Sequence, residues 1–241
     1  MKLNKLHIIA AAVFAILAIS CNKLKLQTDY NRTPHTLDPE LHKTAGKYLS
    51  DRALGVAAPN DTIFIWMMRG IRYAEIDLSE YEKSGRTFVL LHNDAIRRVV
   101  SNVIQTDCFF GANLVNGKPA QQWEDYPKDF VKNYLLYLIA TSVQDHYTMK
   151  EPDLNYETKT LAPEGSLVDL PAGVTRELTN PFFPNPKSLI RFKVINSSPS
   201  NTSDYPIMLN DVRAVRTSSL LATNGTVHVI DRFLTTTLLS E

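Results

Sequence analysis

Two histidines stand near carboxylates at spacings that could support acid–base chemistry. His92 comes two residues before Asp94, and His228 comes three residues before Asp231. A histidine beside a carboxylate is an arrangement that general-base catalysis uses, so a hydrolase is one hypothesis for this chain. The alternative is structural: on a strand, His228 points away from its two neighbours and meets a backbone or carboxylate partner. We favour the structural interpretation, with Asp231 tying a strand end or pairing with Arg232 or another arginine, and we expect no enzyme activity.

Other patterns that mark catalytic or metal sites are missing from the sequence. The six histidines are scattered, and no two stand at the helical spacing of metal ligands with a third donor nearby. The sequence also contains no Gly-x-Ser-x-Gly motif, no glycine-rich phosphate loop and no zinc-protease helix motif. We therefore predict neither a metal site nor a cofactor.

The segment between residues 106 and 126 combines aromatic rings with side-chain amides. The rings are Phe109, Phe110, Trp123 and Tyr126, and the amides are Asn113, Asn116, Gln121 and Gln122. Flat apolar faces together with directed hydrogen bonds are what recognition of a sugar or peptide uses. These four rings are therefore candidate ligand-binding or partner-binding residues; the alternative is that they cover the edge of the core.

A second candidate is the proline-rich stretch at 181–186, which contains Phe182 and Phe183. A stiff loop of this kind either presents the two rings to a ligand or tucks them into the protein.

Two further positions carry possible chemistry. Asp61-Thr62-Ile63 resembles the Asp-Thr-apolar acceptor at which some bacteria O-glycosylate exported proteins, so Thr62 is a possible modification site. The competing interpretation is that Asp61 caps a helix. Cys108 is expected to be a small buried apolar residue rather than a reactive thiol.

The elements that must position these residues are strands late in the chain. Asn224-Gly225 predicts a type I′ hairpin turn, in which both central residues need positive φ, followed by a strand over 226–234. The stretches 207–209 and 212–215, joined by Asn210-Asp211, predict a second strand, turn and strand, and 189–195 predicts another strand.

Helices are predicted in the first half of the chain. An apolar stripe with Asn60-Asp61 as its cap predicts a helix over about 63–74. A strand over 87–91 leads to Asn93 or Asp94, either of which can cap a helix over 95–104. Pro127 opens a further helix whose apolar face ends near residue 142. Helices early and strands late predict an α+β fold with a segregated helical layer.

The N-terminus has the layout of an export signal. Lys2 and Lys5 give a basic start, residues 8–19 are uninterrupted apolar, and small residues lead to Cys21. This run is too short to cross a bilayer core of about 30 Å as a helix, which favours a signal peptide at 1–20. Its end resembles a bacterial lipoprotein signal, with acylation of Cys21; the alternative is ordinary secretory cleavage that leaves a plain thiol.

Removal of this signal leaves a chain that is close to neutral, because two lysines are lost from a formal net charge of +1. No basic run is present, so nucleic acid is not an expected partner. Residues 21–40 are polar and predict a flexible tether with a reach of roughly 25 Å, followed by a single domain at 41–236. The expected location is the bacterial cell envelope, lipid-anchored through Cys21 in the outer membrane, with the periplasmic or surface face left open.

Two motifs resemble those of the fasciclin domain family. The closing motif matches at Asn224, Gly225, His228, Val229, Ile230, Asp231, Arg232 and Leu234, and the opening motif matches over 87–96, which includes Asn93 and Asp94. A weaker likeness lies at 135–139, where Leu138 replaces the histidine of the family. The resemblance implies a wedge of small β-sheets beside helices, over about residues 45–236, and it implies that these motif residues determine the fold rather than catalyse a reaction.

The same resemblance implies a binding or adhesion module at the cell surface, with a protein or glycan as ligand. The missing histidine at Leu138 argues against transferring the receptor-binding role of the family's Tyr-His pair. A second hypothesis is an accessory lipoprotein subunit of an outer-membrane complex that imports glycans or peptides. The adhesion hypothesis predicts a free lipoprotein, whereas the importer hypothesis predicts a persistent complex after detergent extraction.

Overall fold

The computed structural model describes residues 38–56, 58–196 and 205–238. These described residues pack as one compact unit. The predicted signal peptide, Cys21 and the predicted tether up to residue 37 lie outside the described residues.

The helices are short and contact one another. The α-helices of the described residues are α2 (Ala45–Ala53), α3 (Ile65–Tyr73), α4 (Asn93–Ile96), α5 (Phe109–Ala112) and α6 (Lys128–Tyr137). Two 3₁₀ helices are η2 (Leu78–Tyr81) and η3 (Trp123–Asp125). Helix α3 contacts α2, α4 and α6, so the longer helices form one connected layer.

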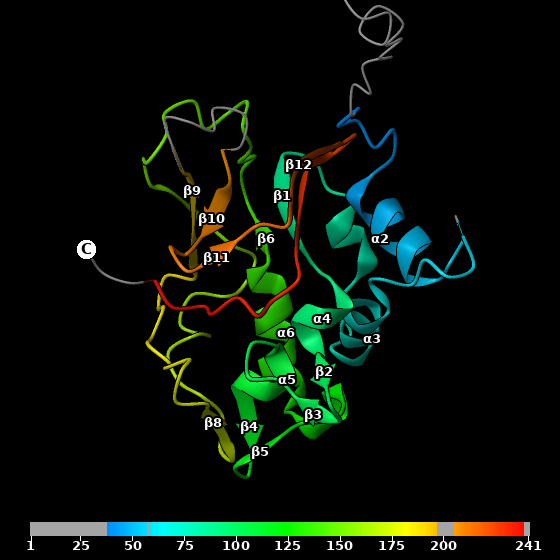
Figure 1. The fold of residues 1–241 in the computed structure, drawn as a ribbon. Helices are drawn as coiled ribbons and strands as arrows, with labels where there is room; N and C mark the ends of the chain where they lie inside the picture. The colour runs from blue at the N-terminus through cyan, green and yellow to red at the C-terminus, as the bar shows by residue number, and fades with distance from the viewer. Residues whose placement is uncertain (1–37, 57, 197–204, 239–241) are drawn as a thin grey trace, which may run out of the picture. The chain divides into compact units, whose positions relative to one another are not determined.

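The central sheet contains both the opening motif and the closing motif. Its strand order is β12 (Thr217–Ala222), β13 (Gly225–Ile230), β1 (Arg86–Leu91) and β6 (Ile139–Ala140). Strands β1 and β13 run parallel, while β12 and β6 are antiparallel to their neighbours. The opening motif and the closing motif are therefore hydrogen-bonded neighbours within one sheet (Figure 1).

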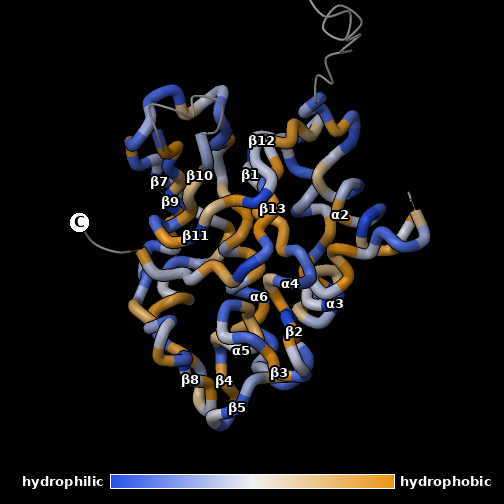
Figure 2. The backbone as a smooth tube through the Cα atoms, in the orientation of Figure 1, coloured by the Kyte–Doolittle hydropathy of each residue, from blue (hydrophilic) through white to orange (hydrophobic). Residues whose placement is uncertain are grey.

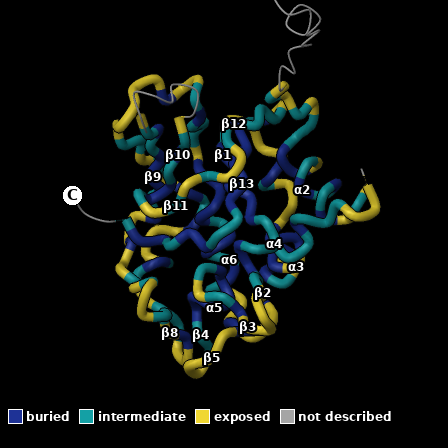
Figure 3. Tube along the Cα trace, viewed as in Figure 1, coloured by how far each residue is buried: buried dark blue, intermediate teal, exposed yellow. Residues whose placement is uncertain are grey.

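The two middle strands of this sheet are covered on both faces. Residues 87–91 of β1 and 226–230 of β13 are all buried (Figure 3). The hydrophobic stretch along β13 is visible in Figure 2. A strand that is buried on both faces cannot alternate polar and apolar residues freely, so its few polar side chains need partners inside the protein.

Three smaller sheets complete the β structure of the described residues. One has the order β11 (Arg213–Ala214), β10 (Ile207–Leu209), β9 (Leu189–Val194) and β7 (Tyr156–Lys159). A second has the order β5 (Lys118–Pro119), β4 (Asn113–Val115) and β8 (Val174–Arg176), and the third pairs β2 (Val99–Val100) with β3 (Val103–Ile104). The predicted α+β class, with small sheets beside a helical layer, is confirmed.

The hairpin geometry differs from the sequence prediction. Asn210 and Asp211 both have positive φ, 50° and 60°, so the left-handed turn lies between β10 and β11. In the β12–β13 hairpin, Ala222 pairs with Gly225, and the loop consists of Thr223 and Asn224, neither of which has positive φ. The predicted type I′ turn at Asn224-Gly225 is wrong, because Gly225 already belongs to the strand.

The predicted helix over 95–104 is also wrong. Helix α4 ends at Ile96, and the chain continues into the β2–β3 hairpin. Ser101 and Asn102, at the tip of this hairpin, have φ values of 50° and 64°. The β-branched residues on either side of this turn favour strands over a longer helix.

Candidate functional site

His228 occupies a closed hydrogen-bonding position in the core. Its ring is fully buried, its Nε2 donates to the carbonyl oxygen of Gln144 at 2.8 Å, and its Nδ1 accepts from the backbone N–H of Ser219 at 3.1 Å. Burial lowers the pKa of His228 from 6.5 to about 4. The imidazole is therefore neutral, and both of its nitrogens bond to backbone groups. Neither nitrogen is free to act as a general base.

The other residues of the two histidine–carboxylate patterns lie apart from this position. His92 is the N-cap of α4, where its Nδ1 accepts from the N–H of Asp94 at 3.2 Å. Burial lowers the pKa of His92, against the opposing effect of the Asp94 carboxylate. Asp231 lies within 3.4 Å of Arg232 and 3.6 Å of Arg216. Within the described residues, no hydrogen bond or ion pair joins His92 to His228.

Asn93 holds two segments together. Its Oδ1 accepts from the N–H of Trp66 in the first turn of α3 at 3.2 Å, and its Nδ2 donates to the carbonyl oxygen of Thr62 at 2.8 Å. The residue at the N-cap of α3 is Phe64, which makes no side-chain cap. The predicted cap at Asp61 is wrong, because its carboxylate pairs with Arg52 at 2.7 Å. The side chain that bonds the first turn of α3 is that of Asn93, which comes much later in the chain.

Asn224 and Gly225 explain why the closing motif needs these two residue types. The Asn224 side chain accepts from the N–H of Ala45 and donates to the carbonyl oxygens of Tyr81 and Lys83. A Cβ atom on Gly225 would lie 2.1 Å from the carbonyl oxygen of Arg86 in the parallel strand β1. The first residue ties α2 and η2 to the hairpin, and the second allows two backbones to approach.

The four rings of the 106–126 segment are buried. The exposed fractions are 0% for Phe109 and Phe110, 1% for Trp123 and 2% for Tyr126. Phe109 lies at the centre of this group, with its ring 4.5 Å from that of Tyr134 and 5.9 Å from that of Phe233. The prediction that these rings form an exposed ligand-binding surface is wrong, because they pack tilted or edge-on against one another and so remove apolar surface from water.

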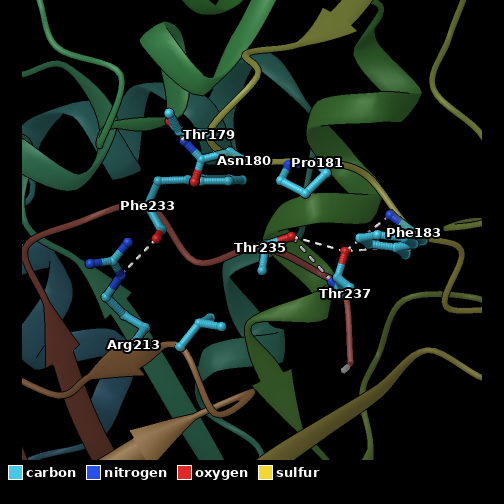
Figure 4. A pocket seen from close by; sticks show the side chains of 9 residues that line it. Thr179, Asn180, Pro181, Phe183, Arg213, Phe233, Thr235 and Thr237 are labelled. Carbon is cyan, nitrogen blue, oxygen red and sulfur yellow. Dashed lines mark hydrogen bonds between the residues drawn. The ribbon is translucent and has the colours of Figure 1, made fainter. Parts of the chain in front are cut away.

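The 181–186 loop divides its two rings between the interior and the surface. Phe182 is partly buried, with the Arg176 guanidinium 5.7 Å from its ring centre, whereas Phe183 is 50% exposed. Phe183 lies at one side of a cavity of about 260 Å³ between this loop and the C-terminal residues (Figure 4). The cavity is lined by Thr179, Asn180, Pro181, Phe183, Val212, Arg213, Phe233, Thr235 and Thr237. We call it the Phe183 pocket.

Hydroxyl groups tie the two walls of the Phe183 pocket together. Thr237 Oγ1 accepts from the N–H of Phe183 at 3.2 Å and lies 3.1 Å from Thr235 Oγ1 (Figure 4). On the opposite side, Arg213 Nε donates to the carbonyl oxygen of Phe233 at 2.8 Å. Burial lowers the pKa of Arg213. The pocket thus combines apolar faces, hydroxyl groups and one guanidinium, which suits a small polar group with an apolar face.

The structure also shows a serine–histidine pair that the sequence did not reveal. Ser219 Oγ lies 2.7 Å from His146 Nδ1, and His146 Nε2 donates to the carbonyl oxygen of Tyr205 at 2.6 Å. Ser219 has a φ of 55° at an irregularity of β12 and is 6% exposed. The two residues are 73 positions apart, so no local spacing signals the pair. The buried Ser219 hydroxyl holds His146, in the loop after β6, through contacts with its backbone N–H and its ring.

The remaining two predicted positions, Thr62 and Cys108, are partly or fully buried. Thr62 is partly buried, and Cys108 is fully buried with its thiol donating to the carbonyl oxygen of Gln105 at 3.1 Å. In residues 38–56, 58–196 and 205–238, no group of three or more His, Cys, Asp or Glu side chains could hold a metal ion. No helix in that same part of the chain has the length and apolar character needed to span a bilayer.

Comparisons with known proteins find similarity among solved structures. No family model matches the sequence, and no curated protein matches it. A FAS1 domain pair from the insect cell adhesion molecule fasciclin I is similar at a TM-score of 0.37 and 14% sequence identity. The match covers 79% of this chain and 45% of that chain, so this chain spans less than half of the solved structure. The similarity assigns no function to this chain.

Proposed function

We propose that this chain is a fasciclin-like, non-catalytic binding module of the bacterial cell envelope, anchored in the outer membrane by acyl chains on Cys21. The lipoprotein-like signal at 1–20 supports the anchor. The paired opening and closing motifs in β1 and β13 support the relation to fasciclin domains. The ligand is a glycan or a peptide segment.

The proposed binding role rests on the Phe183 pocket. An exposed ring beside threonine hydroxyls matches the chemistry of a sugar or a short peptide, which present apolar faces and hydroxyl or amide groups together. The volume of about 260 Å³ fits a single sugar or amino-acid unit of a longer ligand. Thr235 and Thr237 are fixed by mutual hydrogen bonding, so little ordering is needed when the ligand binds.

The test is binding of the full-length lipoprotein, in mild detergent, to arrays of glycans and peptides. We expect Phe183→Ala to weaken binding by about tenfold, because aromatic anchors carry much of the energy of such contacts. Leu178→Ala is the matched control: Leu178 is 94% exposed near the same loop and does not line the pocket. Equal binding by the wild type and Phe183→Ala would refute this site.

A pull-down of the native lipoprotein distinguishes a free module from an importer subunit. A free lipoprotein that binds array ligands supports the adhesion role. A stoichiometric barrel partner that survives mild solubilisation would replace the adhesion role with the accessory-subunit role.

A further inference from the structure

A second hollow lies on α3, separate from the Phe183 pocket, and has a different chemistry. Its volume is about 570 Å³. Its lining includes Trp66, Arg69, Arg72, Gln121, Gln122 and Glu124. We call it the Trp66 hollow. No residue lines both this hollow and the Phe183 pocket.

Helix α3 and the start of η3 build the hollow by close packing. Arg69 and Arg72 are three residues apart, so they project from the same side of α3. A Cβ atom on Gly70 would lie 2.8 Å from the indole of Trp123, so only glycine allows that ring to pack here. Trp123 Nε1 donates to the carbonyl oxygen of Trp66 at 2.8 Å, which fixes the two segments together.

Trp66 orients two guanidinium groups. The Arg69 guanidinium lies 4.9 Å from a ring centre of Trp66, and that of Arg97 lies 5.8 Å away. Arg97 Nη2 also donates to Gln121 Oε1 at 3.4 Å. A guanidinium stacked on an aromatic ring keeps its N–H edge available, and this edge matches the two oxygens of an oxyanion.

No ion pair among the described residues holds the arginines beside Trp66. Among the described residues, no carboxylate forms an ion pair with Arg69, Arg72 or Arg97, although the chain carries salt bridges on many other arginines. Glu124 is the one acidic residue in the lining, and it forms no ion pair with these arginines. Gln121 and Gln122 add amide groups that can bond neighbouring hydroxyls of a ligand.

We propose that the Trp66 hollow binds an oxyanion, a carboxylate, sulfate or phosphate carried by a small molecule, with Arg69 and Arg72 as its direct contacts. The Arg97 guanidinium, 5.8 Å from a ring centre of the same indole, adds to the positive potential. Glu124 limits the affinity by repulsion. The site does not depend on the proposed role of the Phe183 pocket.

Titration calorimetry on the full-length protein tests this inference with three probes: inorganic phosphate, sodium galacturonate and neutral galactose. We expect phosphate, galacturonate or both to bind, with an affinity that falls as ionic strength rises, and galactose not to bind at this site. Arg69→Gln and Arg72→Gln should each weaken binding of the anionic probe by about tenfold. Preference for galacturonate over phosphate would identify an acidic sugar as the source of the oxyanion.

Matched variants separate the hollow from general charge effects. Arg216→Gln removes the same charge from an exposed position outside the hollow and should leave binding unchanged. Glu124→Gln should strengthen binding by about twofold to fivefold, because it removes the repelling carboxylate. Absence of binding by both anionic probes, or equal affinity in the wild type and both arginine variants, would overturn the proposal. Phe183→Ala should retain full anion binding, so failure of either site is distinguishable from failure of the other.

Discussion

The side chain of Asn224 accepts a hydrogen bond from the backbone N–H of Ala45, 179 positions earlier in the chain, at 2.9 Å. The same amide donates to the carbonyl oxygens of Tyr81 at 2.9 Å and Lys83 at 3.3 Å. One buried side chain of the β12–β13 loop thus completes the hydrogen bonding at the start of α2, at the end of η2 and at Lys83 just after it. Its role is to fasten the helical layer to the central sheet.

Asn224→Ala should therefore lower the free energy of unfolding by about 2–3 kcal/mol, because it leaves buried backbone groups without partners. Urea denaturation followed by circular dichroism measures this loss. Asn60→Ala, at an exposed position, is the control and should stay within about 0.5 kcal/mol of the wild type. A loss of the same small size in Asn224→Ala would show that water replaces these hydrogen bonds.

His228 should make the fold sensitive to acid. Its pKa is about 4 in the folded protein and about 6.5 in the unfolded chain, so the unfolded state binds the proton first as pH falls. The contribution to stability is complete above pH 6.5 and declines down to pH 4, by about 3 kcal/mol in total.

The slope of unfolding free energy between pH 4 and 6.5 measures this contribution. It should flatten in His228→Gln, whatever the absolute stability of that variant, because glutamine does not titrate. His42→Gln, whose side chain is 76% exposed, serves as the matched control and should keep the wild-type slope. An unchanged slope in His228→Gln would assign the acid sensitivity to other groups.

Gly225 should tolerate no side chain. The Cβ of Gly225→Ala would lie 2.1 Å from Arg86 O, so β1 and β13 would have to separate. We expect a loss of about 3 kcal/mol or more in urea denaturation. Gly165→Ala is the control, because its Cβ meets open space and only the left-handed backbone is strained, at about 1 kcal/mol. Similar losses in the two variants would mean that β13 shifts to accept the methyl group.

Arg176 should be replaceable by an apolar residue. Its Nε and Nη1 are buried and have no hydrogen-bond partner in the part of the chain that the structure describes, and its guanidinium lies 4.7 Å from the ring centre of Phe233. Burial lowers the pKa of Arg176 to about 10, so the group stays charged at pH 7 at a desolvation cost. Arg176→Met should leave the free energy of unfolding unchanged or raise it by up to about 2 kcal/mol.

Arg213→Met provides the comparison, because that variant loses the hydrogen bond to Phe233 and should be less stable than the wild type. Thermal unfolding of both variants measures the difference. A clear loss of stability in Arg176→Met would show that its contacts with Phe182 and Phe233 outweigh the cost of burying the charge.

Local sequence patterns predicted much of the fold. The strand after Asn224, the strand at 87–91, the helix after Pro127 and the strand at 189–194 all follow from residue periodicity, glycine and proline positions and β-branched residues. These signals operate over a few residues. They predicted the α+β class, but they misplaced the β12–β13 turn and extended α4 into the β2–β3 hairpin, because both errors concern short elements whose bounds depend on neighbours.

The candidate sites were harder to predict. The sequence indicated the rings at 109–126 and 182–183 as candidate binding residues, yet the type of a ring does not reveal whether other rings cover it. Phe109 is enclosed by Tyr134 and Phe233, which come from distant segments, whereas Phe183 remains half exposed beside Thr237. No local sequence pattern predicted the group of polar residues beside Trp66, because Arg69, Arg97 and Gln121 are far apart along the chain.

The sequence by itself determined the α+β class and several of the longer strands and helices, since backbone preferences and apolar periodicity are local. The tertiary structure alone decided that β1 lies beside β13, that Asn93 caps α3 and that Arg69 and Arg72 lie together in the Trp66 hollow. Those relationships depend on which surfaces meet when the core excludes water, and a contact between distant segments leaves no trace in the spacing of neighbouring residues.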